Sequence, residues 1–175
     1  MTAHPETVDG LSIVEFLPEY AGAFRELNIQ WLQRYFCVEP VDLRVLQNPE
    51  EEILASGGSI LFARLGSELV GTLALKHHGD GVFELTKMAV TPRAQGLGIG
   101  RRLLSAAVLR FHALRGAQLY LESHSSLAPA LHLYESLGFR HAPPPRPSEY
   151  RRADVYMVYA ERSPPLDEPV DLLSG

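Results

Sequence analysis

Cysteine is almost missing from this chain of 175 residues, since Cys37 is the only one. A single thiol excludes an internal disulfide and any cysteine-based metal cluster. Basic residues are also fewer than acidic ones, with 16 Lys and Arg residues against 21 Asp and Glu residues. The resulting formal net charge of −5 argues against a general nucleic-acid-binding protein. The sequence has no long apolar span and no signal-like N-terminus, so we expect a cytoplasmic protein that does not enter a membrane.

The histidines do not supply a metal site in place of the missing cysteines. His77 and His78 are adjacent, whereas His124 and His132 lie far along the chain. This spacing matches no recognised pattern of metal ligands. We therefore expect no bound metal and expect these side chains to be structural or to lie at the surface.

Length and composition favour one globular domain. The chain is long enough to form one domain with a hydrophobic core and too short for two domains of ordinary size. Its content of 46% hydrophobic and 21% charged residues is ordinary for a soluble protein. Residues 1–10 show little pattern and are predicted to be a loose lead-in. Residues 163–175 are acidic and contain prolines, which predicts a disordered tail. The domain is therefore expected over residues 11–162.

Hydrophobic periodicity and turn residues predict alternating strands and helices in that domain. Glycine turns join the central strands, which favours an antiparallel meander, and Gly116 is predicted to cap the helix that follows Gly100. The expected strands cover residues 11–16, 59–64, 68–75, 82–90, 118–122, 139–141 and 154–159, and the expected helices cover 18–36, 41–47, 100–115 and 129–137. This order describes a mixed α/β sheet with helices on its faces.

The most informative segment runs from Met88 to Leu104, where an apolar strand enters a loop with glycines at 96, 98 and 100 and then an amphipathic helix. Glycines let the backbone approach a ligand closely, and the N–H groups at a helix start bind anions. The spacing is not G-x-G-x-x-G, and no Gly-Lys-Ser/Thr occurs, so neither the dinucleotide nor the nucleoside-triphosphate loop fits. A glycine-rich turn without any ligand stays open as the plain alternative.

The loop Gln95-x-x-Gly98-x-Gly100 resembles the acetyl-CoA pyrophosphate loop of the GNAT N-acetyltransferase superfamily. A second segment, Leu133 to Phe139, resembles the Leu-Tyr-Glu-Lys-Leu-Gly-Phe signature of the same family. The resemblance covers about residues 11–160 and is greatest to bacterial members with similar motifs at Glu84–Val90 and Tyr150–Val155. It implies a mixed, mostly antiparallel sheet of about seven strands, a V-shaped splay between the fourth and fifth strands, and helices on both faces.

The resemblance also implies which residues bind the co-substrate acetyl-CoA. The pyrophosphate would lie on main-chain amides of the loop, and the pantetheine arm would run along the end of the preceding strand. The implied residues are Gln95, Gly96, Leu97, Gly98, Ile99, Gly100 and Arg101 for the pyrophosphate, Met88, Ala89 and Val90 for pantetheine, and Ser125 and Ala130 near the fourth helix. Many family members carry Asn where this chain has Leu127, which leaves the pantetheine contacts of that segment open.

Acetyl transfer to an amine needs a base and an acid. An alkylamine has a pKa near 10.4, so roughly one molecule in two thousand is neutral at pH 7. Glu84 is the candidate base and Glu122 the reserve, since a glutamate whose pKa is raised by burial suits this task. The alternative is that Glu84 faces solvent or pairs with Lys87. Tyr134 is the candidate acid for the leaving thiolate, against the alternative that it is only a core aromatic residue.

The resemblance implies that the first two helices cover the acceptor site, where Trp31, Tyr35 and Phe36 lie. Trp31 and Tyr35 could form an aromatic wall there, against the alternative that Trp31 only packs in the core, and Glu122 at the end of the neighbouring strand is a further candidate. The predicted reaction is direct attack of a primary amine of a small molecule, peptide or protein on acetyl-CoA in a ternary complex. The alternative is an acyl-CoA-binding sensor or regulatory module with the same fold and no turnover. Homodimers are common in the family, and one is a further expectation here.

Overall fold

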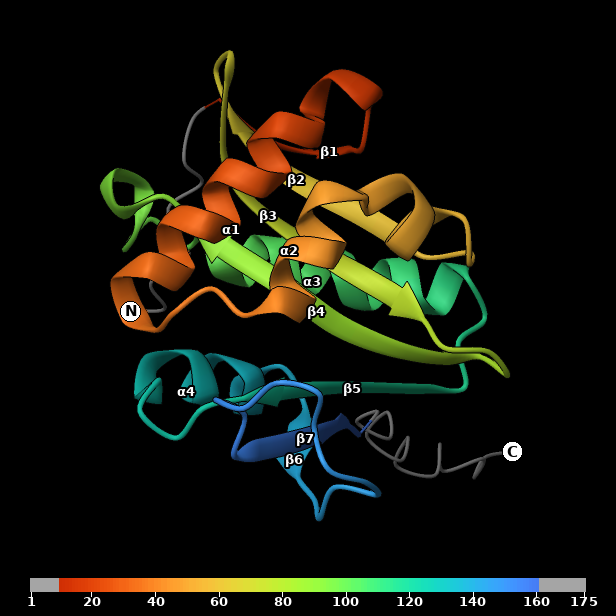
Figure 1. Ribbon diagram of the computed structural model, residues 1–175. Helices are drawn as coiled ribbons and strands as arrows, with labels where there is room; N and C mark the ends of the chain where they lie inside the picture. The colour runs from red at the N-terminus through yellow and green to blue at the C-terminus, as the bar shows by residue number, and fades with distance from the viewer. Residues whose placement is uncertain (1–9, 161–175) are drawn as a thin grey trace, which may run out of the picture.

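The computed structural model describes residues 10–160, in which a strongly bent sheet carries helices on both faces (Figure 1). The expected lead-in, apart from Gly10, and the expected acidic tail lie outside the described residues, so the domain limits stay predictions. The strands are β1 (Leu11–Glu15), β2 (Ser59–Leu65), β3 (Glu68–His77), β4 (Val82–Val90), β5 (Gln118–Ser123), β6 (Phe139–His141) and β7 (Val155–Tyr159). The helices are α1 (Ala21–Tyr35), α2 (Pro40–Gln47), α3 (Ile99–Ala113) and α4 (Ala128–Ser136), with short helical turns η1 (Pro18–Tyr20), η2 (Glu50–Leu54) and η3 (Pro92–Ala94).

Within these residues the seven strands have the order β1-β2-β3-β4-β5-β7-β6. Strands β1 to β4 form the expected antiparallel meander, and β5, β7 and β6 are also antiparallel neighbours. The one parallel pairing joins β4 to β5, and it covers only Val82–Leu85 against Gln118–Leu121. Beyond Leu85 the two strands diverge, as Figure 1 shows, so the predicted splay between the fourth and fifth strands is confirmed.

Two hydrophobic clusters hold helices to opposite faces of the sheet. On one face, Phe24 of α1 and Leu46 of α2 pack against Phe62 of β2. On the other face, Leu103 and Leu104 of α3 belong to a cluster with residues of β2 to β5. Burial of a large apolar side chain stabilises the fold by about 1.5–3 kcal/mol. The packing of α1 and α2 on one side and α3 on the other confirms the prediction of helices on both faces.

The first turn of α2 fixes the position of a buried acidic side chain, that of Asp42. Pro40 occupies the first turn, where its missing N–H costs nothing. Glu39 and Asp42 form a reciprocal capping box, in which the Glu39 N–H donates to Asp42 Oδ2 at 2.9 Å. Pro40 thus begins the second helix, one residue before its predicted start, and Asp42 is fixed in its first turn.

The prediction for Gly116 is wrong. Helix α3 ends at Ala113, and it is Arg115, with φ +54°, that adopts the left-handed conformation after the helix. Gly116 lies directly against Phe111, and a Cβ at position 116 would overlap the Phe111 ring. Glycine is therefore needed here for close packing and not for its backbone freedom. Gly138, in contrast, has φ +107° just after α4, where glycine is favoured for its backbone freedom.

The short helical turn η2 was not predicted, because three successive glutamates gave no apolar period.

No helix among residues 10–160 is both long and apolar enough to span a membrane.

Candidate active site

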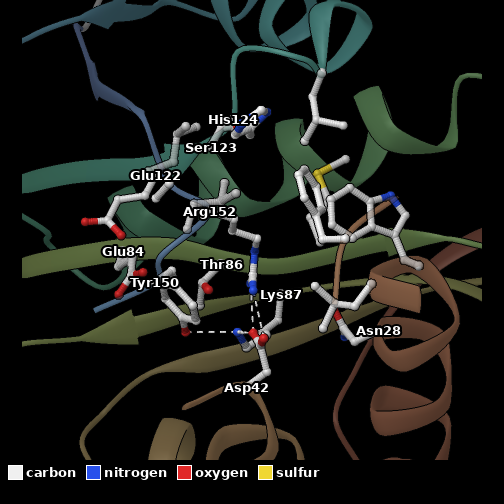
Figure 2. Close-up of a pocket in the computed structure, with 18 of the residues that line it drawn as sticks. Asn28, Asp42, Glu84, Thr86, Lys87, Glu122, Ser123, His124, Tyr150 and Arg152 are labelled. Carbon is white, nitrogen blue, oxygen red and sulfur yellow. Dashed lines mark hydrogen bonds and ion pairs between the residues drawn. The ribbon is translucent and has the colours of Figure 1, made fainter. Parts of the chain in front are cut away.

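The divergence of β4 and β5 opens a cavity, here called the central cleft. Its floor comes from Leu85 to Met88 of β4 and Leu121 to Ser123 of β5. Its walls come from α1, α4 and the segment 150–153, and one side chain of α2 reaches into it. Figure 2 shows that side chains from both strands and from these walls converge on this space. The cleft is therefore built where hydrogen bonding between the two strands stops.

A bulge in β4 lies at the centre of the cleft. Thr86 pairs with Ala74 and Ala89 pairs with Thr72, so Lys87 and Met88 together oppose a single residue of β3. Lys87 has φ +53°, which is uncommon for a residue other than glycine. Lys87 and Met88 are neighbours in sequence, yet both line the cleft. The strain of this conformation is offset by the contacts that the Lys87 side chain makes.

Those contacts belong to a buried cluster, here called the Asp42 network, formed by Glu39, Asp42, Lys87, Tyr150 and Arg152. Figure 2 shows all of these except Glu39. Lys87 Nζ donates to Asp42 Oδ1 at 2.8 Å and to Tyr150 Oη at 2.9 Å. Arg152 binds both oxygens of Asp42 at 2.8 Å and donates to Glu39 Oε2 at 2.9 Å. The network therefore ties α2, β4 and the segment before β7 together.

The pKa values of the network follow from burial and pairing. Burial acts to raise the pKa of Asp42, but the hydrogen bonds from Arg152 and Lys87 outweigh it and lower that pKa to about 2. Burial lowers the pKa of Lys87 below its usual value, and the attraction of Asp42 only partly opposes this. The side chain of Asp42 is 0% exposed and that of Lys87 4%. Charges buried this deeply persist because each has a close, hydrogen-bonded partner.

The two candidate bases both line the cleft. Glu84 Oε2 lies 2.8 Å from His78 Nε2, and the residue is buried. The alternative pairing of Glu84 with Lys87 is wrong, because Lys87 binds Asp42. Glu122 accepts a hydrogen bond from Ser148 Oγ at 2.5 Å. Burial raises the pKa of Glu122, and the nearby Glu84 raises it further against the opposing effect of the Ser148 hydroxyl.

Tyr134 also lines the cleft, on the side of α4. It packs edge-on against Phe139, with ring centroids 6.1 Å apart, so its core-packing role is real. Burial raises the pKa of Tyr134 to about 12, which keeps the phenol protonated at neutral pH. The geometry is therefore compatible with Tyr134 as the acid for the leaving thiolate and with Tyr134 as a core aromatic residue.

The glycine-rich loop leaves the end of β4 and enters α3. Gly96 and Gly98 have φ +81° and +75°, and Gly98 is the residue before the first turn of α3. The Gln95 side-chain amide donates to the Val90 carbonyl at 3.3 Å, and Arg101 donates to Ser136 Oγ of α4 at 3.0 Å. Positive φ at both glycines and the adjacent helix start provide the backbone geometry of an anion site.

Gly100 connects this loop to the cleft. A Cβ there would lie 3.1 Å from the Met88 side chain and 3.3 Å from that of Leu133. Of the three residues predicted to contact pantetheine, Met88 lines the cleft, whereas Ala89 and Val90 continue β4 toward the loop, and Ala89 is buried. Leu97 is exposed and Ile99 is buried in the core.

The segment before α4 is already bonded within the chain. The Ser125 hydroxyl and N–H both donate to Asp154, at 2.6 and 2.7 Å. Leu127, at the Asn position of the family, lines the cleft, and Ala130 lies half-buried in α4. The contacts predicted for Ser125 and Ala130 stay predictions.

Only part of the predicted aromatic wall lies in the cleft. Trp31 and Phe36 line the cleft, with ring centroids 5.8 Å apart. Tyr35 is 41% exposed, packs against Trp31 at 5.2 Å and is not among the lining residues. His124 closes this side, with its ring 5.3 Å from Phe36.

Asp42, Lys87, Tyr150 and Arg152 were not predicted as site residues. A signal existed: Lys87 and the pair Tyr150 and Arg152 belong to the two subgroup-like motifs, Glu84–Val90 and Tyr150–Val155. The network joins these motifs through Asp42. Among residues 10–160 no group of three or more His, Cys, Asp or Glu side chains is arranged to hold a metal ion.

The Asp42 network makes a testable contribution to stability at acid pH. Because the pKa of Asp42 is lowered from 3.8 to about 2, its stabilisation is complete above pH 4 and is lost as the pH falls toward 2. A shift of this size corresponds to about 2 kcal/mol. The free energy of unfolding of Asp42→Asn, measured with urea, should therefore approach that of the wild type between pH 5 and pH 2.5.

Glu51→Gln removes an exposed carboxylate and serves as the control, with no pH-dependent difference expected in that range. A gap between wild type and Asp42→Asn that stays constant from pH 5 to pH 2.5 would contradict the lowered pKa.

Comparison with known proteins agrees with this architecture. Residues 56–141 match the family model described as an acetyltransferase (GNAT) domain. A GNAT-family acetyltransferase structure from Staphylococcus aureus superposes with a TM-score of 0.76 at 22% identity, covering 85% of this chain and 98% of that one. A Salmonella typhimurium structure described with its cofactor acetyl-CoA gives a TM-score of 0.67 at 22% identity, covering 89% and 97%. At this identity the structures show the fold alone.

Curated relatives are also acetyltransferases by name. Mycothiol acetyltransferase of Thermomonospora curvata is 40% identical over 82 residues, which is 46% of this chain and 27% of that protein. Mycothiol acetyltransferase of Cellulomonas flavigena is 29% identical over 93% of this chain and 52% of its own length. N-alpha-acetyltransferase RimI of Mycobacterium tuberculosis is 41% identical over 45% of this chain and 49% of its own. The chain thus spans about half, or less, of the length of these relatives.

The antiparallel meander, the splay of β4 from β5, the glycine loop leading into α3 and the match over residues 56–141 agree with one another. The chain contains a GNAT acetyltransferase domain, which the family model matches over residues 56–141.

Proposed function

We propose that this chain transfers an acetyl group from acetyl-CoA to a primary amine by direct attack within a ternary complex. The observation that carries the proposal is the position of the central cleft, which begins where β4 and β5 separate and leads to the glycine loop at the end of β4. A thioester arm laid in the cleft and a diphosphate on the loop would share one continuous path along β4.

The loop supplies the binding energy for the nucleotide part. Main-chain amides from Gln95 to Arg101 and the start of α3 would hold the pyrophosphate, since a helix N-terminus carries about half a positive charge. Beyond Leu85, the main chain of β4 has no strand partner on the β5 side. Its free amides near Met88 are available for the pantetheine arm and for the thioester oxygen, where a negative charge develops during attack.

Proton transfer falls to the acidic and phenolic side chains of the cleft. Glu122 is the stronger candidate base, because burial raises its pKa toward neutrality, and Glu84 beside it is the other. The amine nitrogen attacks the thioester carbon, the carbon–sulfur bond breaks, and the thiolate takes a proton from Tyr134. The amine's proton passes to the glutamate, directly or through water.

The acceptor is proposed to be a primary amine of a small molecule, a peptide or a protein. The names of the relatives include both kinds, a mycothiol acetyltransferase and an N-alpha-acetyltransferase. The aromatic side chains of Trp31 and Phe36 would contact the body of the acceptor.

The first test separates an enzyme from a sensor. Acetyl-CoA at 100 times its dissociation constant should stabilise the wild type by about 2.7 kcal/mol in thermal unfolding. The wild type should also acetylate members of an amine panel. Tyr134→Phe should bind CoA with unchanged affinity and lose about 100-fold in kcat, because only the proton donor is removed.

Tyr35→Phe is the matched control, since Tyr35 is exposed outside the cleft. Binding without transfer to any amine would favour the acyl-CoA-binding sensor. Absence of stabilisation by acetyl-CoA would favour a glycine turn without a ligand.

The second test identifies the base. The pH profile of kcat/KM should rise on the acid side as Glu122 loses its proton, at a pH above the usual range for a glutamate. Glu122→Gln should abolish this acid limb and lower kcat/KM by about 100-fold. Glu84→Gln is measured in parallel, and loss of the limb there instead would assign the base to Glu84. An unchanged profile in both variants would remove both residues from this role.

A further inference from the structure

We infer that Asp42 determines the class of acceptor: by occupying Lys87 and Arg152 it leaves the central cleft without a free cation, so the acceptor is an amine with no carboxylate on the carbon beside its amino group. This inference rests on the proposed acetyl transfer and adds what the acceptor must look like. It also assigns a role to a buried network that the transfer chemistry itself does not use.

The geometry of the two strong cations carries the inference. Lys87 and Arg152 both line the cleft, and Figure 2 shows the ends of both side chains converging on Asp42. In many sites such side chains would bind a substrate carboxylate, and Arg is especially suited to this because its guanidinium binds both oxygens. Here that bidentate position is already filled by Asp42, at 2.8 Å to each oxygen.

Each of the two cations also binds a second group. Arg152 reaches Glu39 at 2.9 Å, and Lys87 reaches Tyr150 Oη at 2.9 Å. The Tyr150 ring lies against both cations, 4.4 Å from Lys87 Nζ and 4.7 Å from the Arg152 guanidinium carbon. Two carboxylates thus balance two cations inside the protein, and no charge is left over for a ligand.

His124 is the third basic side chain among the lining residues that the structure describes. Its Nδ1 lies 2.7 Å from Ser126 Oγ, and its Nε2 lies 3.8 Å from Asp154 Oδ2. A positive charge on His124 would therefore also be matched within the chain. Every basic group that lines the cleft between residues 10 and 160 has an acidic partner of its own.

Among residues 10–160, neither Glu84 nor Glu122 is hydrogen-bonded to a lysine or an arginine. Glu122 accepts from the Ser148 hydroxyl, and Glu84 is bonded to His78 at 2.8 Å and to the Tyr120 hydroxyl at 3.5 Å. An ammonium group entering beside them is attracted, whereas a carboxylate on the neighbouring carbon is repelled and meets no donor. Trp31 and Phe36 provide an apolar surface for the rest of an aryl- or alkylamine.

The test compares acceptors that differ only at the carbon beside the amine. Tyramine, tyrosine amide and tyrosine form one set, and phenethylamine, phenylalanine amide and phenylalanine form another. The amine and the neutral amide should each exceed the amino acid at least tenfold in kcat/KM. The neutral amide is as bulky as the amino acid. A tenfold difference in kcat/KM between these two acceptors therefore reports the effect of the carboxylate charge and not of size.

Asp42→Asn tests the residue. With Asp42 neutral, Lys87 and Arg152 gain a free positive charge, and the ratio of kcat/KM for tyramine over tyrosine should fall at least tenfold. Folding of the variant is checked by circular dichroism and CoA binding. Glu39→Gln, which removes the second carboxylate partner of Arg152 and leaves its pairing with Asp42, should shift the ratio in the same direction by less and serves if Asp42→Asn does not fold. Glu149→Gln, which removes an exposed charge of the same segment, should leave the ratio unchanged.

The outcomes separate a failure of this inference from a failure of the proposed function. Acetylation of tyrosine as fast as tyramine by the wild type, or an unchanged ratio in folded Asp42→Asn, would overturn the inference while leaving the acetyltransferase proposal in place. Transfer to no acceptor of any kind, with CoA still bound, would overturn the proposed function itself and this inference with it.

Discussion

The short parallel pairing of β4 with β5 is the constraint on which the rest of the structure depends. Four residues of each strand are hydrogen-bonded, and from Leu85 onward the strands separate. A sheet that simply continued would leave no cavity and no free main-chain amides. The separation places Thr86, Lys87 and Met88 at an interior surface, and the same strand then delivers the chain to the glycine loop.

The Asp42 network keeps this opening in one shape. Opposite charges from α2, β4 and the segment before β7 meet at a side chain that is 0% exposed, so none of these elements can shift without breaking an ion pair in a region of low dielectric. The network also compensates for the left-handed backbone at Lys87. Shape and charge of the proposed acceptor side therefore have one origin, while the proposed CoA side depends on loop geometry at Gly96 and Gly98.

Much of the fold could be predicted because its signals are local. Alternating apolar residues marked strands, glycine turns marked the joins of the central ones, and the loop at Gln95–Gly100 predicted an anion site. The splay came only from the family resemblance, since no local pattern ends a strand pairing. The Asp42 network could not be predicted, because Asp42 meets Lys87 and Arg152 across 45 and 110 residues of sequence. The left-handed conformation of Lys87 has no sequence signal either, as lysine rarely adopts it.

The most direct measurement of the central claim is a structure of the protein with bound CoA. We expect the pyrophosphate on the main-chain amides of residues 95–101, the pantetheine arm between the separated ends of β4 and β5, and the sulfur beside the Tyr134 hydroxyl. Coenzyme bound at another surface, or a sulfur far from Tyr134, would contradict it.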